Sequence, residues 1–187
     1  MGDRDVTMAQ LLRLCGWIDA ITTRVGQVAA WAVLAAVVVS AANAVSRKVF
    51  GASSNMWLEL QPLLFGCVFL LCAPWALKAN AHIRIDLLSG RLSKRTRDWI
   101  DVIGHGLFLI PLAAVMVWTG WPYFLRSWVA GEQSTNPGGL AQYPGKLLVV
   151  LGFALLLAQG VSELIKRVAI LRGGLVDDAV ATGQRKI

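Results

Sequence analysis

Apolar residues are gathered into four long runs along the 187-residue chain, at about 26–46, 57–77, 100–122 and 146–165. A helix needs about 20 mostly apolar residues to cross about 30 Å of hydrocarbon, and each run meets that length. The connections between the runs are short. The pattern predicts an all-α membrane protein in which residues 1–187 form a single domain with four transmembrane helices.

The segment before the first span has a helical pattern of its own. Its apolar residues recur three and four positions apart, at Leu11, Leu14, Cys15, Ile18 and Ile21. This spacing is typical of an amphipathic helix, and it allows two interpretations. Residues 1–25 form an N-terminal amphipathic helix at the cytoplasmic interface, or they simply extend the first span.

Apolar and polar residues alternate between the second and third spans, from Lys78 to Leu88. A lone strand at a membrane surface would leave its edges unpaired, so we expect an ordered loop instead. A short cytoplasmic interfacial helix ending near Arg97 should follow it. The polar residues 172–187 are interpreted as a cytoplasmic tail without an assigned role.

Composition supports a bilayer as the solvent of this chain. Hydrophobic residues make up 56% and charged residues only 16%, with a mean hydropathy of +0.59, whereas soluble domains carry about a quarter charged residues. The three cysteines do not form a disulfide framework, because Cys67 and Cys72 lie inside the second span and Cys15 precedes the first.

Positive charge is strongly asymmetric about the four spans. Of the 18 Lys and Arg residues, only Arg47, Lys48, Arg126 and Lys146 fall on the flank opposite the termini. Basic residues near span ends are retained in the cytoplasm, so the asymmetry places both termini there. The net charge of +7 follows from this topology and from anionic headgroups, so we expect membrane lipids as partners and no nucleic acid.

Two helix faces carry small or polar residues at helical spacing. One is on the first span (Ala29, Ala32, Ala36, Ser40, Asn43), and the other is on the fourth (Gly145, Gly152, Gln159, Glu163). Small residues allow helices in lipid to approach closely, and polar residues there seek partners. Both faces are therefore predicted to pack against protein.

Glu59 and Gln61 enter the second span about one turn below its outer surface. A carboxylate at that depth is costly unless it is paired or reaches water. We hypothesise an ion pair between Glu59 and Arg47, with Asn43 beside it. In the alternative interpretation, both charged side chains extend to the headgroups.

The third span carries Asp98, Asp101 and His105 near its cytoplasmic end, and these side chains are expected to face the connection containing His82, Arg84 and Asp86. Because His82 and His105 are the only histidines, a haem- or quinone-linked membrane anchor is one alternative function. A small homo-oligomeric channel is another, although the polar residues cluster at span ends. We expect no enzyme activity and no cofactor, because the sequence contains no phosphate-binding glycine loop, paired-cysteine metal motif or Ser-His-Asp set.

Three segments resemble a known family. They are the Arg-x-x-Phe-Gly motif at 47–51, the acidic Trp57-Leu-Glu59-Leu-Gln61 stretch, and His82-Ile-Arg84-Ile-Asp86. The whole chain resembles the small, DctQ-like membrane subunit of tripartite ATP-independent periplasmic (TRAP) transporters. The Asn-Ala-x-Ser-Arg-Lys stretch at 43–48 is similar to the subgroup labelled for mannitol or chloroaromatic compounds.

The resemblance implies a bacterial inner-membrane protein whose partners are a large permease subunit and a periplasmic solute-binding protein. It implies uptake of an organic acid driven by sodium, with the small subunit as part of the fixed scaffold. The structural and interface residues that it suggests are Arg47, Glu59, His82, Arg84 and Asp86. Asn43, Gln61, Asp101 and His105 join them as candidates from the residue pattern, and none is expected to bind substrate.

Overall fold

The computed structural model describes residues 3–51, 54–79 and 94–171, and the elements in these ranges are helices. Helix α1 covers Asp3–Phe50 and α2 covers Asn55–Lys78. The third span is built from α4 (Lys94–Ile103), a π-helical turn η1 (Gly104–Leu109) and α5 (Ile110–Val129). Helix α6 covers Tyr143–Leu171.

Four of these helical stretches are long and apolar enough to cross a membrane: Gln10–Phe50, Asn55–Lys78, Trp99–Val129 and Tyr143–Leu171. The predicted class, an all-α membrane protein with four spans, is confirmed. Most of their apolar surface lies outside the bundle, since only 6 to 33% of the most apolar window in each span is buried. Lipid or partner proteins must therefore cover these faces.

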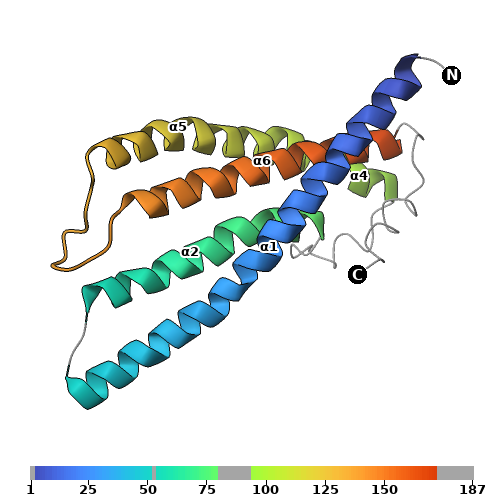
Figure 1. Cartoon of the computed structure of the whole chain (residues 1–187). Coiled ribbons are helices and arrows are strands. Elements are labelled where there is room, and N and C mark those ends of the chain that lie inside the picture. Colours follow the sequence, from blue (N-terminus) through green and yellow to red (C-terminus); the bar gives the residue numbers. More distant parts are fainter. Residues whose placement is uncertain (1–2, 52–53, 80–93, 172–187) are drawn as a thin grey trace.

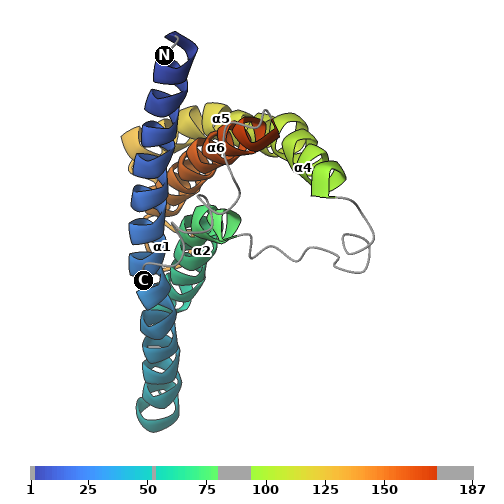
Figure 2. The same ribbon diagram turned by 90° about the vertical axis from the view of Figure 1, so that its right-hand side faces the viewer.

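The helices lie side by side in a shallow layer. Helix α1 packs on α2, α2 packs on α6, and α6 packs on α5, while α1 crosses obliquely and also contacts α6 (Figure 1). After a turn of 90°, α1 stands upright on the left and the foreshortened α2, α6 and α5 lie beside it (Figure 2). The end of α1, the start of α2 and the α5–α6 connection lie at one end of the bundle, which we call the loop end; the opposite end, where α1 begins, is the terminal end (Figure 1).

Of the two interpretations of residues 1–25, the structure shows a helix continuous with the first span. Helix α1 contains 48 residues, which at 1.5 Å each makes about 72 Å, more than twice the thickness of the hydrocarbon. Cys15 and Thr22 are buried against α6, whereas Leu14 and Trp17 are exposed. Packing against α6 thus continues the helix beyond the length that the bilayer requires.

Small residues set the spacing between helices, as predicted. Ala29, Ala36 and Asn43 of α1 are buried, and so are Gly152 and Gln159 of α6. A Cβ atom at Gly152 would lie 2.7 Å from the Cβ of Leu70, so glycine is needed where α6 meets α2. The predicted protein-facing stripes on the first and fourth spans are confirmed.

Two other features of the spans depart from simple helices. Helix α2 runs without interruption through Pro62 and Pro74. In the third span, the helix that contains Lys94 does not end near Arg97 but continues through η1 into α5, and the part of the expected interfacial helix before Lys94 lies outside the described residues. The loop expected before it, with His82, Arg84 and Asp86, lies outside the described residues, as does the tail 172–187.

Candidate functional site at the loop end

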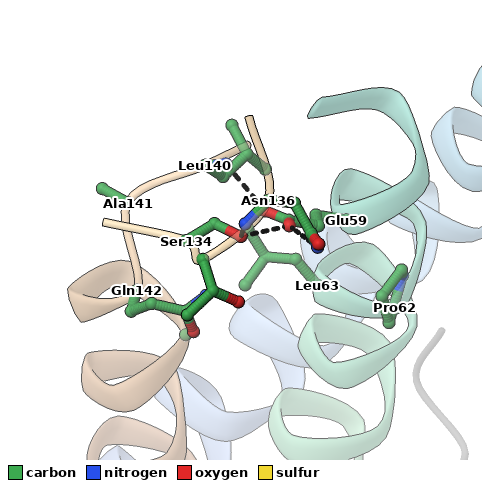
Figure 3. A pocket seen from close by; sticks show the side chains of 10 residues that line it. Glu59, Pro62, Leu63, Ser134, Asn136, Leu140, Ala141 and Gln142 are labelled. Atoms are coloured by element: carbon green, nitrogen blue, oxygen red, sulfur yellow. Dashed lines mark hydrogen bonds between the residues drawn. The ribbon is translucent and has the colours of Figure 1, made fainter. Parts of the chain in front are cut away.

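The loop end is organised by the carboxylate of Glu59. Its Oε1 accepts hydrogen bonds from the Ser134 hydroxyl and from Asn136 Nδ2, the latter at 2.8 Å, and its Oε2 accepts one from the Leu140 backbone N–H at 2.7 Å. Glu59 lies in the second turn of α2, and all three donors belong to the α5–α6 connection (Figure 3). The carboxylate therefore fastens this connection to α2.

The connection is also held by its own backbone. Ser134 N–H donates to Leu140 O at 3.0 Å, and Gln133 pairs with Ala141 in an isolated antiparallel bridge. Asn55 at the start of α2 adds a bond from Nδ2 to Pro137 O at 2.9 Å. A Cβ atom at Gly139 would lie 2.7 Å from Glu59 Oε2, so the close approach requires glycine there. The connection therefore has a defined structure, held by its own backbone and by α2.

A cavity of about 370 Å³ lies between α2 and this connection (Figure 3). Its wall includes Glu59, Pro62, Leu63 and Ser134. Because the Glu59 oxygens already accept three hydrogen bonds, they are occupied in holding the connection rather than offered to a solute. The geometry suits a structural anchor better than a ligand-binding carboxylate.

An ion pair closes the base of the connection. Lys146 at the start of α6 forms a short ion pair with Glu132, and its Nζ lies 4.1 Å from the centre of the Tyr123 ring on α5. The hydrogen bond from Lys146 is the largest of the effects that hold the pKa of Glu132 below its ordinary value. The pair joins the end of α5 to the beginning of α6.

At the terminal end, a polar cluster joins α1 to α6. Lys166 Nζ lies 3.0 Å from Asp19 Oδ2 and 2.6 Å from Glu163 Oε1. Gln159 is fully buried, and its Nε2 donates to Asp19 Oδ1 and to Glu163 Oε1, both at 2.9 Å. The cluster is completed by Thr22, whose hydroxyl donates to Gln159 Oε1. Every member has a partner within the chain.

The hypothesised ion pair between Arg47 and Glu59 is not formed. Glu59 is occupied by the α5–α6 connection, and Arg47 is exposed at the end of α1 without an ion-pair partner in the described ranges. Arg47 and Glu59 lie near span ends on the same side of the membrane. This does not bring them together, because the α5–α6 connection offers Glu59 closer donors. Gln61 bonds only to Trp57 O in its own helix, and Asn43 is buried on α1.

Asp101 is paired with α6 instead of standing alone: its Oδ2 lies 3.4 Å from Arg167 Nη2. His105 lies in η1, where its ring Nδ1 is 2.5 Å from Asp101 O. Whether these residues also face His82, Arg84 and Asp86 lies beyond the described ranges. Among residues with defined placement, no group of three or more His, Cys, Asp and Glu side chains is arranged to hold a metal ion.

Sequence reasoning missed the polar cluster at the terminal end. Neither Asp19 nor Lys166 is among the candidate residues that the sequence suggested. A signal was available, because Lys166 continues the Gln159 and Glu163 spacing of four and three residues on α6. The Ser134 and Asn136 partners of Glu59 gave no comparable signal, since their separation from Glu59 exceeds 70 residues.

Comparison with known proteins places this architecture among transporter components. Residues 36–169 match the family described as the DctQ component of tripartite ATP-independent periplasmic transporters. The match covers well over half of the chain, from within the first span to near the end of the fourth, and the chain belongs to this family. It is thus a multi-pass membrane protein and a component of a transporter, not an enzyme. A search of curated proteins found no match.

Proposed function

We propose that this chain is the small permease subunit of a sodium-coupled TRAP transporter. In this role it is a fixed scaffold partner of the large permease subunit, which transports an organic acid delivered by a periplasmic solute-binding protein. The mannitol or chloroaromatic subgroup suggested by residues 43–48 is part of the same proposal. The protein resides in the bacterial inner membrane with both termini in the cytoplasm, so that the loop end faces the periplasm.

The observation that carries the proposal is the way in which the buried polar groups are used. Asp19, Gln159, Glu163 and Lys166 bond to one another, and the Glu59 carboxylate bonds to the α5–α6 connection. These groups join helices to one another, and their hydrogen bonds and ion pairs are made within the chain. A frame of this kind supports a scaffold role, because transport of an organic anion requires polar ligands near the membrane midplane.

The exposed faces supply the surface for the partner. Large apolar side chains such as Val28, Trp31, Phe69 and Trp118 are more than 70% exposed. Helices packed in a single layer can be covered by another membrane protein on one side and by lipid on the other. Among the site candidates, Asn43, Arg47, Gln61, Asp101 and His105 are proposed as structural or interface groups, together with His82, Arg84 and Asp86.

Co-purification tests the partnership with the large permease. The full chain, tagged at one terminus and co-expressed with the large TRAP permease subunit encoded in the same genome, should purify in mild detergent as a stable complex with that subunit. An unrelated multi-pass membrane protein expressed at the same level is the control. A homo-oligomer of this chain from which the large subunit is absent contradicts the proposal.

Reconstitution tests the sodium coupling. Proteoliposomes containing both membrane subunits should take up a radiolabelled organic acid only when its binding protein and an inward sodium gradient are present. Replacing sodium with potassium should abolish uptake. Uptake that is unchanged when this chain is omitted argues against a required scaffold role.

A further inference from the structure

A second cavity at the loop end contains groups that the proposed scaffold role does not use. It has a volume of about 510 Å³ and lies between the end of α5 and the start of α6. Its wall is formed by Tyr123, Arg126, Ser127, Ala130, Glu132 and Lys146. Two cations and one carboxylate leave it with one net positive charge, which matches a single anionic group.

The cavity contains a hydroxyl without a partner. Ser127 is 2% exposed, and among the described residues its Oγ completes no hydrogen bond of acceptable geometry. The hydroxyl is near Glu132, and it helps to lower the pKa of that carboxyl without completing a bond within normal distance. Buried polar atoms in proteins nearly always have a hydrogen-bond partner, such as another protein group, a water or an ion. The lining of the cavity is therefore incomplete.

Arg126 is the cation with free capacity. Its Nε donates to Pro122 O of the preceding turn at 3.3 Å, and no carboxylate in the described ranges pairs with its guanidinium. Lys146, in contrast, is already paired with Glu132. Two terminal nitrogens of a guanidinium form a planar fork, a geometry that suits the oxygens of a phosphate group.

The surroundings indicate which anionic group reaches this position. Trp121, Phe124, Trp128 and Tyr143 form a chain of ring contacts with centroids 4.8 to 6.1 Å apart. Tryptophan and tyrosine are enriched at the level of lipid headgroups. On α5, Trp118, one turn farther from the loop end than Trp121, and Leu125 expose apolar surface against which acyl chains can lie.

We propose that this cavity binds the phosphate of a membrane phospholipid headgroup. Arg126 provides the principal charged contact, the Ser127 hydroxyl donates a hydrogen bond, and the aromatic side chains fix the depth of the lipid. The inference does not depend on the transport activity. A soluble anion such as inorganic phosphate or a carboxylate shares the same chemistry, and the experiment separates these sources.

The test uses the full chain in detergent after delipidation. Native mass spectrometry measures retention of dioleoyl phosphatidylethanolamine, dioleoyl phosphatidylglycerol and dioleoylglycerol, which has the same acyl chains but no phosphate. Both phospholipids should be retained and the diacylglycerol should not. Arg126→Gln should lower phospholipid retention about tenfold, the usual effect of losing a charged hydrogen bond. Lys48→Gln, which removes an exposed cation at the loop end of α1, should have no effect.

Ser127→Ala distinguishes binding from folding. Since the hydroxyl has no partner in the free protein, the variant should keep the melting temperature of the parent and still retain less phospholipid. Equal phospholipid retention by Arg126→Gln and the parent overturns the proposal, as does equal retention of dioleoylglycerol. Displacement of the phospholipid by millimolar inorganic phosphate or succinate overturns the lipid assignment in favour of a soluble anion.

Discussion

The hydroxyl of Thr22 donates to Gln159 Oε1 across 2.8 Å, joining α1 to α6 inside the bundle. The orientation of this amide is fixed by its other contacts, because both acceptors of its Nε2 are carboxylate oxygens. The carbonyl oxygen must then face Thr22. The buried amide of Gln159 thus hydrogen-bonds to residues of both helices, including both acidic residues of the cluster.

Gln159→Leu should destabilise the protein, because it leaves polar groups of Thr22, Asp19 and Glu163 with fewer partners. We expect a loss of about 1–3 kcal/mol, measured as a lower unfolding temperature in detergent. Gln61→Leu is the control, since Gln61 bonds only within its own helix. Equal effects of the two substitutions would show that the amide at position 159 is not an interhelical contact.

Lys166→Met should have a larger effect than Gln159→Leu. Lys166 lies between Asp19 and Glu163, and its removal leaves two largely buried carboxylates close together. Breaking a buried ion pair costs about 3–5 kcal/mol. Thermal unfolding measures the loss.

A compensating variant checks the cause of that loss. Combining Lys166→Met with Asp19→Asn and Glu163→Gln removes all three charges and should recover much of the stability. No recovery in the triple variant argues that Lys166 acts through packing alone.

Glu59→Gln should loosen the α5–α6 connection without unfolding the bundle. An amide cannot accept the Leu140 N–H and both side-chain donors as the carboxylate does, because one of its two ends is itself a donor. Hydrogen exchange at residues 133–142 should accelerate about tenfold or more, while exchange in α6 stays slow. Arg47→Gln is the matched control, and acceleration of the same amides by that variant would revive the discarded ion pair.

Acidification should break the ion pair between Glu132 and Lys146 at the base of the α5–α6 connection. The folded-state pKa of Glu132 is lowered by its bond to Lys146, so the stabilising effect is fully present above the ordinary value of 4.5. It is lost as pH falls through the lowered folded-state pKa. Tryptophan fluorescence in detergent, to which Trp128 contributes, should therefore change below pH 4.5 and lose much of that change in Glu132→Gln. A parent protein whose fluorescence is flat from pH 6 to 3 would contradict this.

The sequence was sufficient for the spans and for the faces on which they pack. Runs of about 20 apolar residues and the spacing of Ala29, Ala36, Gly152 and Gln159 depend on local periodicity, which a single sequence displays. The length of α1 could not be decided in this way. Its extension depends on contacts of Cys15 and Thr22 with α6, which lies more than 130 residues away.

The partner of Glu59 was predicted wrongly for a related reason. Charge and topology favoured Arg47, whereas the structure uses neutral donors from Ser134, Asn136 and a backbone N–H. A prediction from charge and topology does not consider hydrogen-bond donors within the α5–α6 connection. Here the turn geometry of residues 133–141 presents the donors, and that geometry depends on the contact itself.

The two polar fastenings lie at opposite ends of α6 and involve different neighbours. Glu59 of α2 holds the connection leading into the helix, and Asp19 of α1 holds Lys166 near its last turns. A helix held at one end alone can change its tilt, whereas contacts near both ends restrict the direction of its axis. The orientation of α6 is thereby constrained near both of its ends, by α2 through the connection and by α1 directly.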